Sequence, residues 1–540
     1  MLRKHNGHKR YEVIYLYIVS LILFTFGLWS QEIVGFDARF YLFALEMWRH
    51  GMSFFPMTYH QFYPDYPASS TILIYLIANI VGGLNKWVAV FPSAAMAALT
   101  VTFTYLIGSL HSKRYGLFAV LYLMMTVTFL KSARSITLDF YPTMATVVSF
   151  YLVYSGDKEG KPYRFWYVFI FLLLGFIFRG PIGLIIPTSV VSIYFLLTKN
   201  FKRFFMMGIG SLFMLVLCTA ILLWLANRTG GSSFMQAVLR MEILGRMDDS
   251  KIPFYFYLIR SMGDYAISFP IAFLVAMMVA YDAIKKRYLY DMKFLIILCA
   301  WVFIILIGMS IPGDKKIRYV LPMLPAVVLI AAYPFIYLPQ DQKFLIWRKI
   351  MLGVFLLLPF IFLISTSILF FYAKYHQLNL SVHYAKTMLF FLILQTIQVF
   401  ILYRYTHDMM RREVWISLVA AVSFICLQYQ MIEPLSHYFD RARDFVQFVE
   451  VNRLHENAKL IFYKEKSDGL PIKYMAHMRV DDIPQYIDRP DDLLKVNFPA
   501  FIITSQSYFN ALPDSIAKQF YFITQNKIGH VKVVVFRRKL

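Results

Sequence analysis

Two groups of ionisable residues in this sequence have the types and spacing needed for chemistry at a phosphate ester. Asp37 and Arg39 lie in the stretch EIVGFDARFY, directly after the first long apolar run. Lys315, Lys316 and Arg318 form a cationic cluster in PGDKKIRYVLP, between two later apolar runs. A carboxylate can act as a general base toward an acceptor hydroxyl or phosphate. Arginine binds phosphate through paired hydrogen bonds and lysine binds it as a point charge, so the cluster suits a phosphate or pyrophosphate.

Other ionisable residues lie near the ends of apolar runs, where charged groups are costly and usually paired or facing a cavity. Candidate binding or catalytic residues among them are Arg134 and Asp139 in SARSITLDFYP and Arg179 in FIFRGPIG. Arg134 and Asp139 could equally form a structural ion pair, and the sequence leaves both interpretations open. Four more are interpreted as ordinary interfacial charges: Glu46, Lys86, Asp248 and Asp249.

A carboxylate opposite a phosphate-binding cluster indicates group transfer from a phosphate-linked donor. Asp37 would deprotonate the acceptor, and the cations would stabilise the charge that develops on the departing phosphate. The sequence has no nucleotide-binding loop, and ATP is absent from the outer side of the membrane, where these residues are expected. The donor is therefore expected to be a membrane lipid that carries an activated group.

The composition predicts a polytopic membrane protein. The 540 residues are 59% hydrophobic and 16% charged, whereas about 25% of residues are charged in a soluble chain. Runs such as VIYLYIVSLILFTFGLW are long enough to cross a bilayer as a helix. The net charge of +23 does not indicate a nucleic-acid partner, because the basic residues occupy short connections between apolar runs. The three cysteines lie inside apolar runs and predict neither a disulfide framework nor a thiol metal site.

Charge alternation gives the expected topology. About thirteen spans are predicted, near 12–29, 88–110, 116–133, 141–155, 165–179, 181–198, 203–226, 264–281, 293–310, 319–337, 350–373, 386–403 and 414–431. Every second connection is basic, from HSKR to YRYTHDMMRR, and the positive-inside rule places these connections in the cytoplasm together with the N-terminus. The apolar run 68–84 would reverse this order if it crossed, so it is expected to be an interfacial helix.

The residues after Met431 contain only short apolar stretches, separated by polar segments. AKLIFYKE, AFIITS, FYFITQN and VKVVVFRR have the pattern of short strands with helical stretches between them. The expected fold is an α-helical membrane domain over 1–432, which includes the outer loop 30–87, followed by a small α/β domain over 433–540. An odd number of spans places this C-terminal domain on the outer side, which is the periplasm if the membrane is a bacterial inner membrane.

Several of these stretches also resemble a known class of enzymes. FDARFYLFALEMWRHGMSFFP is similar to the first outer loop of GT-C class membrane glycosyltransferases, most of all the bacterial aminoarabinose transferases of lipid A and the related protein O-mannosyltransferases. ARSITLDFYPTM resembles the segment with the second acidic residue of the family, at Asp139. FRGPIG has Arg179 in place of a lysine, and KIRYVLPMLP matches an Arg-Tyr-x-x-Pro-x-x-Pro element at Arg318 and Tyr319. Ala38 stands where the family often has another acid.

The resemblance implies a GT-C fold and a polyprenyl-phosphate-linked sugar donor, bound between the spans and the first outer loop. The acceptor would be a glycolipid, such as lipid A or lipopolysaccharide, or a protein. Asp37 would be the catalytic carboxylate and Asp139 a supporting acid. The donor phosphate and lipid would contact Arg39, Arg134, Arg179, Lys315, Lys316, Arg318 and Tyr319. Some relatives need a divalent cation, but no cluster of His, Asp and Glu with metal-ligand spacing is evident in this sequence.

Two other functional classes are weighed against this interpretation. A transporter or flippase also has many spans, but it would be expected to show inverted repeats and broken helices near the midplane. A non-catalytic scaffold protein would account for the aromatic residues, but not for a carboxylate and a cationic cluster on the same side.

Overall fold

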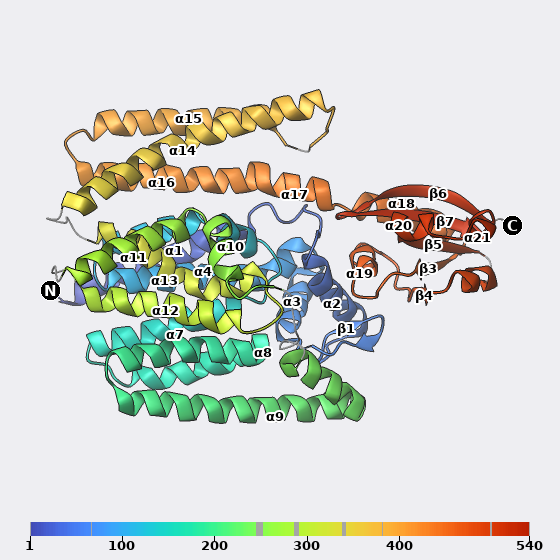
Figure 1. Ribbon diagram of the computed structural model, residues 1–540, viewed down its shortest axis with the longest axis horizontal. Coiled ribbons are helices and arrows are strands. Elements are labelled where there is room, and N and C mark those ends of the chain that lie inside the picture. The colour runs from blue at the N-terminus through green and yellow to red at the C-terminus, as the bar shows by residue number, and fades with distance from the viewer. Residues whose placement is uncertain are drawn as a thin grey trace. The chain divides into compact units, whose positions relative to one another are not determined.

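The computed structural model describes residues 2–65, 67–244, 252–285, 291–336, 342–380, 382–496 and 499–538 (Figure 1). The chain forms two compact units. The first, here called the helical unit, contains Met1–Phe26, Pro64–Ser69 and Val90–Glu433. The second, here called the α/β unit, contains Gly27–Tyr63, Ser70–Ala89 and Pro434–Leu540.

The helical unit is built from long apolar helices. They are α1 (Leu2–Thr25), α4 (Lys86–Ser109), α5 (Lys113–Met124), α6 (Val127–Ala133), α7 (Phe140–Lys158), α8 (Arg164–Leu197), α9 (Phe201–Leu239), α10 (Phe256–Asp264), α11 (Ser268–Ile284), α12 (Met292–Ser310), α13 (Leu324–Ala332), α14 (Gln342–Tyr375), α15 (Tyr384–Arg404) and α16 (Met409–Leu427). Shorter helical turns are η1 (Arg240–Leu244), η2 (Ile317–Met323), η3 (Tyr333–Phe335) and η4 (Gln428–Ile432).

These helices make the chain a multi-pass membrane protein, as predicted. Among the described residues, eight helices are long and apolar enough to cross a membrane, or up to ten if the bent pairs α5–α6 and α10–α11 each count as one span. The predicted number of about thirteen is larger for three reasons. The apolar part of α1 is short, α7 is rich in polar residues and largely buried, and α8 counts once although it is broken.

Helix α8 is a helical hairpin. Gly180 has φ 61° and ψ −153°, a conformation that glycine adopts without a steric penalty. Pro181 follows, where the fixed φ of proline suits the first turn of a helix. Across the hairpin the backbones of Gly175 and Gly183 touch, because a Cβ atom on Gly183 would lie 2.0 Å from the carbonyl oxygen of Gly175. The predicted separate spans 165–179 and 181–198 correspond to the two halves.

One end of the helical unit gathers three of the connections that were predicted to be cytoplasmic, those before α5, α14 and α16. Lys113 Nζ lies 2.6 Å from Glu12 Oε1. The buried carboxylate of Glu413, at the start of α16, pairs with Arg114 and with Arg348 of α14. These ion pairs join the first turns of α5, α14 and α16 and the first part of α1 at the same end, which agrees with the predicted charge alternation.

The α/β unit contains a five-stranded sheet in the order β4-β3-β5-β7-β6. The strands are β3 (Lys459–Tyr463), β4 (Gln485–Ile487), β5 (Ala500–Ser505), β6 (Phe520–Ile528) and β7 (Val531–Arg538). β3 is parallel to β4 and β5, whereas β7 is antiparallel to β5 and β6. The helical elements that follow the last span are α17 (Glu433–Asp440), α18 (Arg443–His455), α19 (Leu470–Met475), η5 (Pro490–Lys495), α20 (Gln506–Asn510) and α21 (Asp514–Ala517). The predicted small α/β fold is confirmed.

Most of the predicted outer loop belongs to this second unit. It forms α2 (Asp37–His50), the hairpin β1 (Met57–Thr58) and β2 (Gln61–Phe62), and α3 (Ser69–Val81). Ala38 and Leu42 of α2 are buried in the same core as Phe462 and Val535 of the sheet. The sequence pattern places this loop with the spans, whereas the packing joins most of it to residues 434–540. Helix α3 has only 13 residues, about 20 Å at 1.5 Å per residue, and so is too short to cross the bilayer core.

Candidate functional site

Asp139 is the centre of a charged cluster in the helical unit. It is only 4% exposed, and both of its carboxylate oxygens face guanidinium groups. Oδ1 lies 3.1 Å from Nη2 of Arg179, and Oδ2 lies 2.9 Å from Nε of Arg318. The structure therefore brings together three predicted site residues that are far apart in the sequence.

The surrounding elements hold Asp139 in this orientation. Asp139 precedes α7, but its carboxylate accepts no hydrogen bond as a helix cap. Instead, the hydroxyl of Thr137 donates to Asp139 Oδ2 at 3.2 Å. The hydroxyl of Ser93 in α4 donates to the carbonyl oxygen of Thr137 at 2.9 Å and accepts a hydrogen bond from the Thr137 backbone N–H at 3.1 Å. Ser93 and Thr137 are both buried, so this connection fixes the approach of the chain to Asp139.

Each arginine comes from a break between helices. Arg179 immediately precedes the turn of the α8 hairpin at Gly180. Arg318 lies at the start of η2, after the connection that follows α12. Because Arg179 lies at a turn, its guanidinium extends from the end of a helix toward Asp139. The motif FRGPIG thus contains both the cation and the glycine at which the helix turns.

Tyr319 is the aromatic centre of the same cluster. Its ring centroid lies 5.5 Å from Arg179 Cζ, 5.8 Å from Arg318 Cζ and 5.8 Å from Lys316 Nζ. Its hydroxyl donates to Asp314 Oδ2 at 3.2 Å, and Lys316 Nζ lies 3.4 Å from the same oxygen. Three cations around the ring thus face the two carboxylates of Asp139 and Asp314, which leaves a net positive charge.

The remaining predicted cation of this segment has a different environment. Lys315 is 8% exposed, and its Nζ donates to the backbone carbonyl of Ile252 at 3.1 Å. It lies next to Lys316 in the chain, but its ammonium group is directed to this carbonyl. Lys315 thus fixes the 314–318 segment against the residues before α10 and adds to the positive charge there.

Arg134 does not join the cluster. Its guanidinium contacts the Glu433 carboxylate, with Nη2 and Oε2 3.0 Å apart, and its Nη1 donates to the carbonyl oxygens of Phe24 and Phe26 at the end of α1. Its Cζ also lies 4.1 Å from the ring centroid of Tyr429. The sequence left open an ion pair between Arg134 and Asp139, and the structure does not form it. Each residue is paired, but with other partners.

Asp37 and Arg39 are located in the α/β unit. Asp37 is the first residue of α2 and is 5% exposed. The helix N-terminus carries partial positive charge, which favours a carboxylate at this position. Arg39 Cζ lies 5.7 Å from the ring centroid of Tyr63. Residues two apart in a helix do not face each other, so the helix geometry does not favour a salt bridge between Asp37 and Arg39.

Two of the residues interpreted as interfacial charges are instead buried in the α/β unit. Glu46 has an exposed fraction of 0% and Lys86 of 4%. Lys86 Nζ lies 3.3 Å from Nε2 of His437. Asp248 and Asp249 lie outside the described residues. The sequence of the 30–87 loop predicted interfacial charges at Glu46 and Lys86. It did not reveal that residues of the C-terminal segment pack against them.

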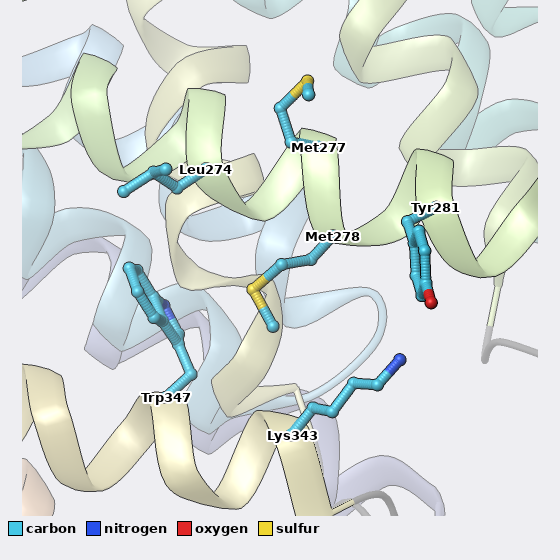
Figure 2. A pocket seen from close by; sticks show the side chains of 6 residues that line it. All are labelled: Leu274, Met277, Met278, Tyr281, Lys343 and Trp347. Carbon is cyan, nitrogen blue, oxygen red and sulfur yellow. The ribbon is translucent and has the colours of Figure 1, made fainter.

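Two surface pockets lie in the helical unit, away from these residues. One has a volume of about 440 Å³ and lies between α11 and α14 (Figure 2). Its lining is Leu274, Met277, Met278, Tyr281, Lys343 and Trp347. The other, of about 470 Å³, is lined by residues that include Glu12, Lys113 and Arg114 at the predicted cytoplasmic end. Neither pocket is lined by a predicted site residue.

Comparisons with known proteins agree with this architecture. A family model described as dolichyl-phosphate-mannose-protein mannosyltransferase matches residues 65–224. That range includes Asp139 and Arg179, but neither Asp37 nor the 314–319 segment. An uncharacterized protein of Aquifex aeolicus (strain VF5) is 26% identical over 258 residues, which cover 46% of this chain and 49% of that protein. The alignment thus spans about half the length of this relative.

Solved structures are similar over nearly the whole chain. ArnT from Cupriavidus metallidurans in the apo state is 15% identical with a TM-score of 0.69, and covers 98% of this chain and 98% of its own. The same protein bound to undecaprenyl phosphate is 16% identical with a TM-score of 0.66, at 97% and 97% coverage. The archaeal oligosaccharyltransferase AglB from Archaeoglobus fulgidus, in complex with an inhibitory peptide and a dolichol-phosphate, is 13% identical with a TM-score of 0.50, at 95% and 73% coverage. The fold is therefore the one predicted from the resemblance to GT-C class glycosyltransferases.

Proposed function

We propose that this chain is an integral-membrane glycosyltransferase that moves a sugar from a polyprenyl-phosphate-linked donor to an acceptor on the outer face. The observation that carries the proposal is the cluster of Arg179, Lys316 and Arg318 around Tyr319, which keeps a net positive charge after Asp139 and Asp314 are counted. Such a cluster suits a phosphate group. Support comes from the shared fold with ArnT, whose structure has been solved with undecaprenyl phosphate, and with AglB, solved with a dolichol-phosphate.

In the proposed reaction Asp37 removes a proton from the acceptor hydroxyl or phosphate. The acceptor oxygen then forms a bond to the anomeric carbon of the sugar, and the bond from that carbon to the donor phosphate oxygen breaks. The electron pair of the broken bond leaves with the polyprenyl phosphate. Arg179 and Arg318 stabilise the added negative charge on that phosphate, as preorganised cations do at other transferred groups.

Asp139 has a supporting role in this proposal. Its two oxygens are each occupied by an arginine, so its carboxylate is poorly placed to remove a proton from an acceptor. It instead orients Arg179 and Arg318 and offsets their mutual repulsion before the phosphate arrives. Lys315 acts through the backbone of its segment, and Arg39 remains a proposed contact of the donor on the α/β unit. Arg134 is left out, because its guanidinium is engaged by Glu433 and the end of α1.

The acceptor is proposed to be a glycolipid such as lipid A or lipopolysaccharide. The match to ArnT includes the C-terminal part of the chain, because it covers 98% of both proteins. A protein acceptor is the second candidate, since the family model over residues 65–224 is described as a protein mannosyltransferase. The chain would reside in a bacterial inner membrane, with its N-terminus in the cytoplasm and the α/β unit in the periplasm. A transporter or flippase would bind the same lipid without transferring its sugar.

A labelling experiment tests the proposal. Purified protein in liposomes would receive a series of radiolabelled polyprenyl-phosphate sugars together with either lipid A or a membrane protein fraction. We expect one donor to label one acceptor class, and we expect Arg318→Ala to reduce that labelling at a fixed low donor concentration. Movement of the lipid across the bilayer without labelling of any acceptor would contradict the transferase and favour a flippase.

A further inference from the structure

A second cluster of ionisable side chains lies entirely within the α/β unit. Glu46 and His50 are one turn apart on α2, and His60 belongs to the turn between β1 and β2. One ligand atom from each of these three residues lies within 4.8 Å of the other two. The rings of His50 and His60 have centroids 4.2 Å apart. A carboxylate and two imidazoles at this spacing are a typical set of ligands for a transition metal.

The carboxylate of Glu46 is the member of the cluster that calls for a cation. Its exposed fraction is 0%, and neither of its oxygens has a side-chain hydrogen-bond partner among the residues that the structure describes; the imidazoles of His50 and His60 and the backbone of His60 are its recorded polar neighbours. The nearest basic atom recorded is Nε2 of His50, 3.9 Å from Oε2. Burying a carboxylate without a neighbouring cation is costly.

Asp481, from the segment after α19, faces the two imidazoles. Its Oδ2 lies 2.9 Å from Nε2 of His50, and its Oδ1 lies 3.1 Å from Nε2 of His60. In a tetrahedral zinc site with bonds of about 2.0–2.2 Å, neighbouring ligand atoms are about 3.3–3.6 Å apart. The separations between the histidines and Asp481 are already close to those of such a site. Glu46 would have to approach by only a fraction of an ångström on the His50 side.

We propose that Glu46, His50, His60 and Asp481 bind one divalent transition-metal ion, with Zn²⁺ the best match to two nitrogen and two oxygen ligands. Each histidine binds as the neutral imidazole through Nε2, with its proton on Nδ1. The ion neutralises the buried Glu46 carboxylate and replaces the histidine contacts with Asp481. Arg49, whose Nη1 lies 3.6 Å from Asp481 Oδ1, remains beside the site as a charged neighbour.

The site would join α2 to the 476–484 segment within the α/β unit. Arg49 already makes such a connection, because its Nη2 donates to the carbonyl oxygens of Met478 and Arg479. A metal bond adds a second connection one turn away on the same helix. Because Asp37 begins α2, the ion would fix the helix that carries the proposed base. The ion takes no part in the proposed transfer reaction.

Metal binding by the purified full-length protein tests this inference without any activity measurement. The protein would be freed of metal with a chelator and titrated with ZnCl₂ alone, and the bound zinc would be counted by elemental analysis. We expect one Zn²⁺ per chain, and X-ray absorption that shows nitrogen and oxygen ligands at about 2.0–2.2 Å. Glu46→Gln and His60→Ala should each lower the zinc affinity at least 100-fold. His530→Gln, a change at an exposed histidine of the same unit, should leave it unchanged.

Thermal unfolding gives a second measurement. Added Zn²⁺ should raise the unfolding temperature of the wild-type and His530→Gln proteins, but not that of Glu46→Gln. Glu46→Gln keeps the size of the side chain and removes its charge, so it should fold at least as well as the metal-free wild-type protein. Failure of the folded wild type to bind zinc stoichiometrically would overturn the proposal. Equal zinc affinity in the wild-type, Glu46→Gln and His60→Ala proteins would overturn it as well.

Discussion

Asp37 and Asp139 are both buried carboxylates at the start of a helix, yet their surroundings suit different tasks. Asp139 is enclosed by Arg179 and Arg318 and orients these cations. Asp37 begins α2 on the other unit and is the proposed base. The residue types and their motifs led us to propose both as site residues. The partners of Asp139 could not be predicted, because the arginines at 179 and 318 approach it only after the helices pack.

The cationic cluster should determine donor affinity. Replacing Lys316 or Arg318 with alanine removes a contact to the donor phosphate, and each lost charge-assisted contact should cost about 1.5–3 kcal/mol. The dissociation constant for labelled undecaprenyl phosphate should therefore rise about 10-fold to 150-fold. Lys202→Ala, at an exposed position at the start of α9, is a matched control and should bind as the wild type does. Wild-type affinity in both cluster variants would mean that these residues are only interfacial.

His477 should make the stability of the α/β unit depend on pH. Burial, together with the charge of Arg443, lowers the pKa of His477 to about 4 from an ordinary value of 6.5. The folded state thus keeps the imidazole neutral while the unfolded chain takes up a proton. Stability is complete above about pH 6.5 and falls as the pH decreases toward 4, by up to about 3 kcal/mol.

Hydrogen exchange of residues 434–538 in the full-length protein would measure this effect. Protection should decrease between pH 6.5 and 4 in the wild type, after correction for the intrinsic exchange rate. His477→Gln has no imidazole to protonate and should show a shallower decrease. Identical pH dependence in the two proteins would show that the burial of His477 carries no such cost.

At the scale of the elements, glycine and proline determine only some of the helix breaks. FRGPIG indicated the division of α8, because Gly180 accepts a positive φ and Pro181 can begin a helix. The bends between α5 and α6 (77°) and between α10 and α11 (114°) were not predicted. The stretches 125–126 and 265–267, where these bends occur, contain neither glycine nor proline. Tertiary packing, which a single sequence does not display, decides such bends.

Gly183 should tolerate no side chain. A Cβ atom there would lie 2.0 Å from the carbonyl oxygen of Gly175, so the two halves of α8 would have to separate. Gly183→Ala should destabilise the folded protein by about 1–3 kcal/mol or more and lower its unfolding temperature in detergent. Gly208→Ala in α9 is the matched control, because a Cβ atom there meets nothing within 4 Å. An unchanged unfolding temperature for Gly183→Ala would contradict the close contact.

For the whole molecule, hydropathy was sufficient to predict the membrane fold, and charge alternation predicts an orientation of the helical unit that labelling can test. Neither could show that α2 packs with residues 434–540, because Ala38 and Leu42 contact strands more than 400 residues later. A comparable distance in the sequence separates Asp481 from the Glu46 cluster. Only the helical spacing of Glu46 and His50 was visible in the sequence, whereas His60 and Asp481 are brought to them by folding.

The topology should be visible by chemical labelling. In a cysteine-free background, Lys113→Cys reports on the HSKR connection and Lys527→Cys reports on an exposed position of the α/β unit. A membrane-impermeant maleimide added to spheroplasts should label only Lys527→Cys, and both should react after the membrane is permeabilised. Labelling of Lys113→Cys in intact spheroplasts would reverse the proposed orientation.

The rate of sugar transfer by Asp37→Asn tests the central proposal most directly. Asparagine keeps the size of the side chain but removes the negative charge and the basicity. With the labelled donor and its acceptor saturating, we predict that turnover falls by about two to four decades, while the dissociation constant for undecaprenyl phosphate stays near that of the wild type. A folded Asp37→Asn protein that transfers sugar at the wild-type rate would contradict the proposal that Asp37 is the base.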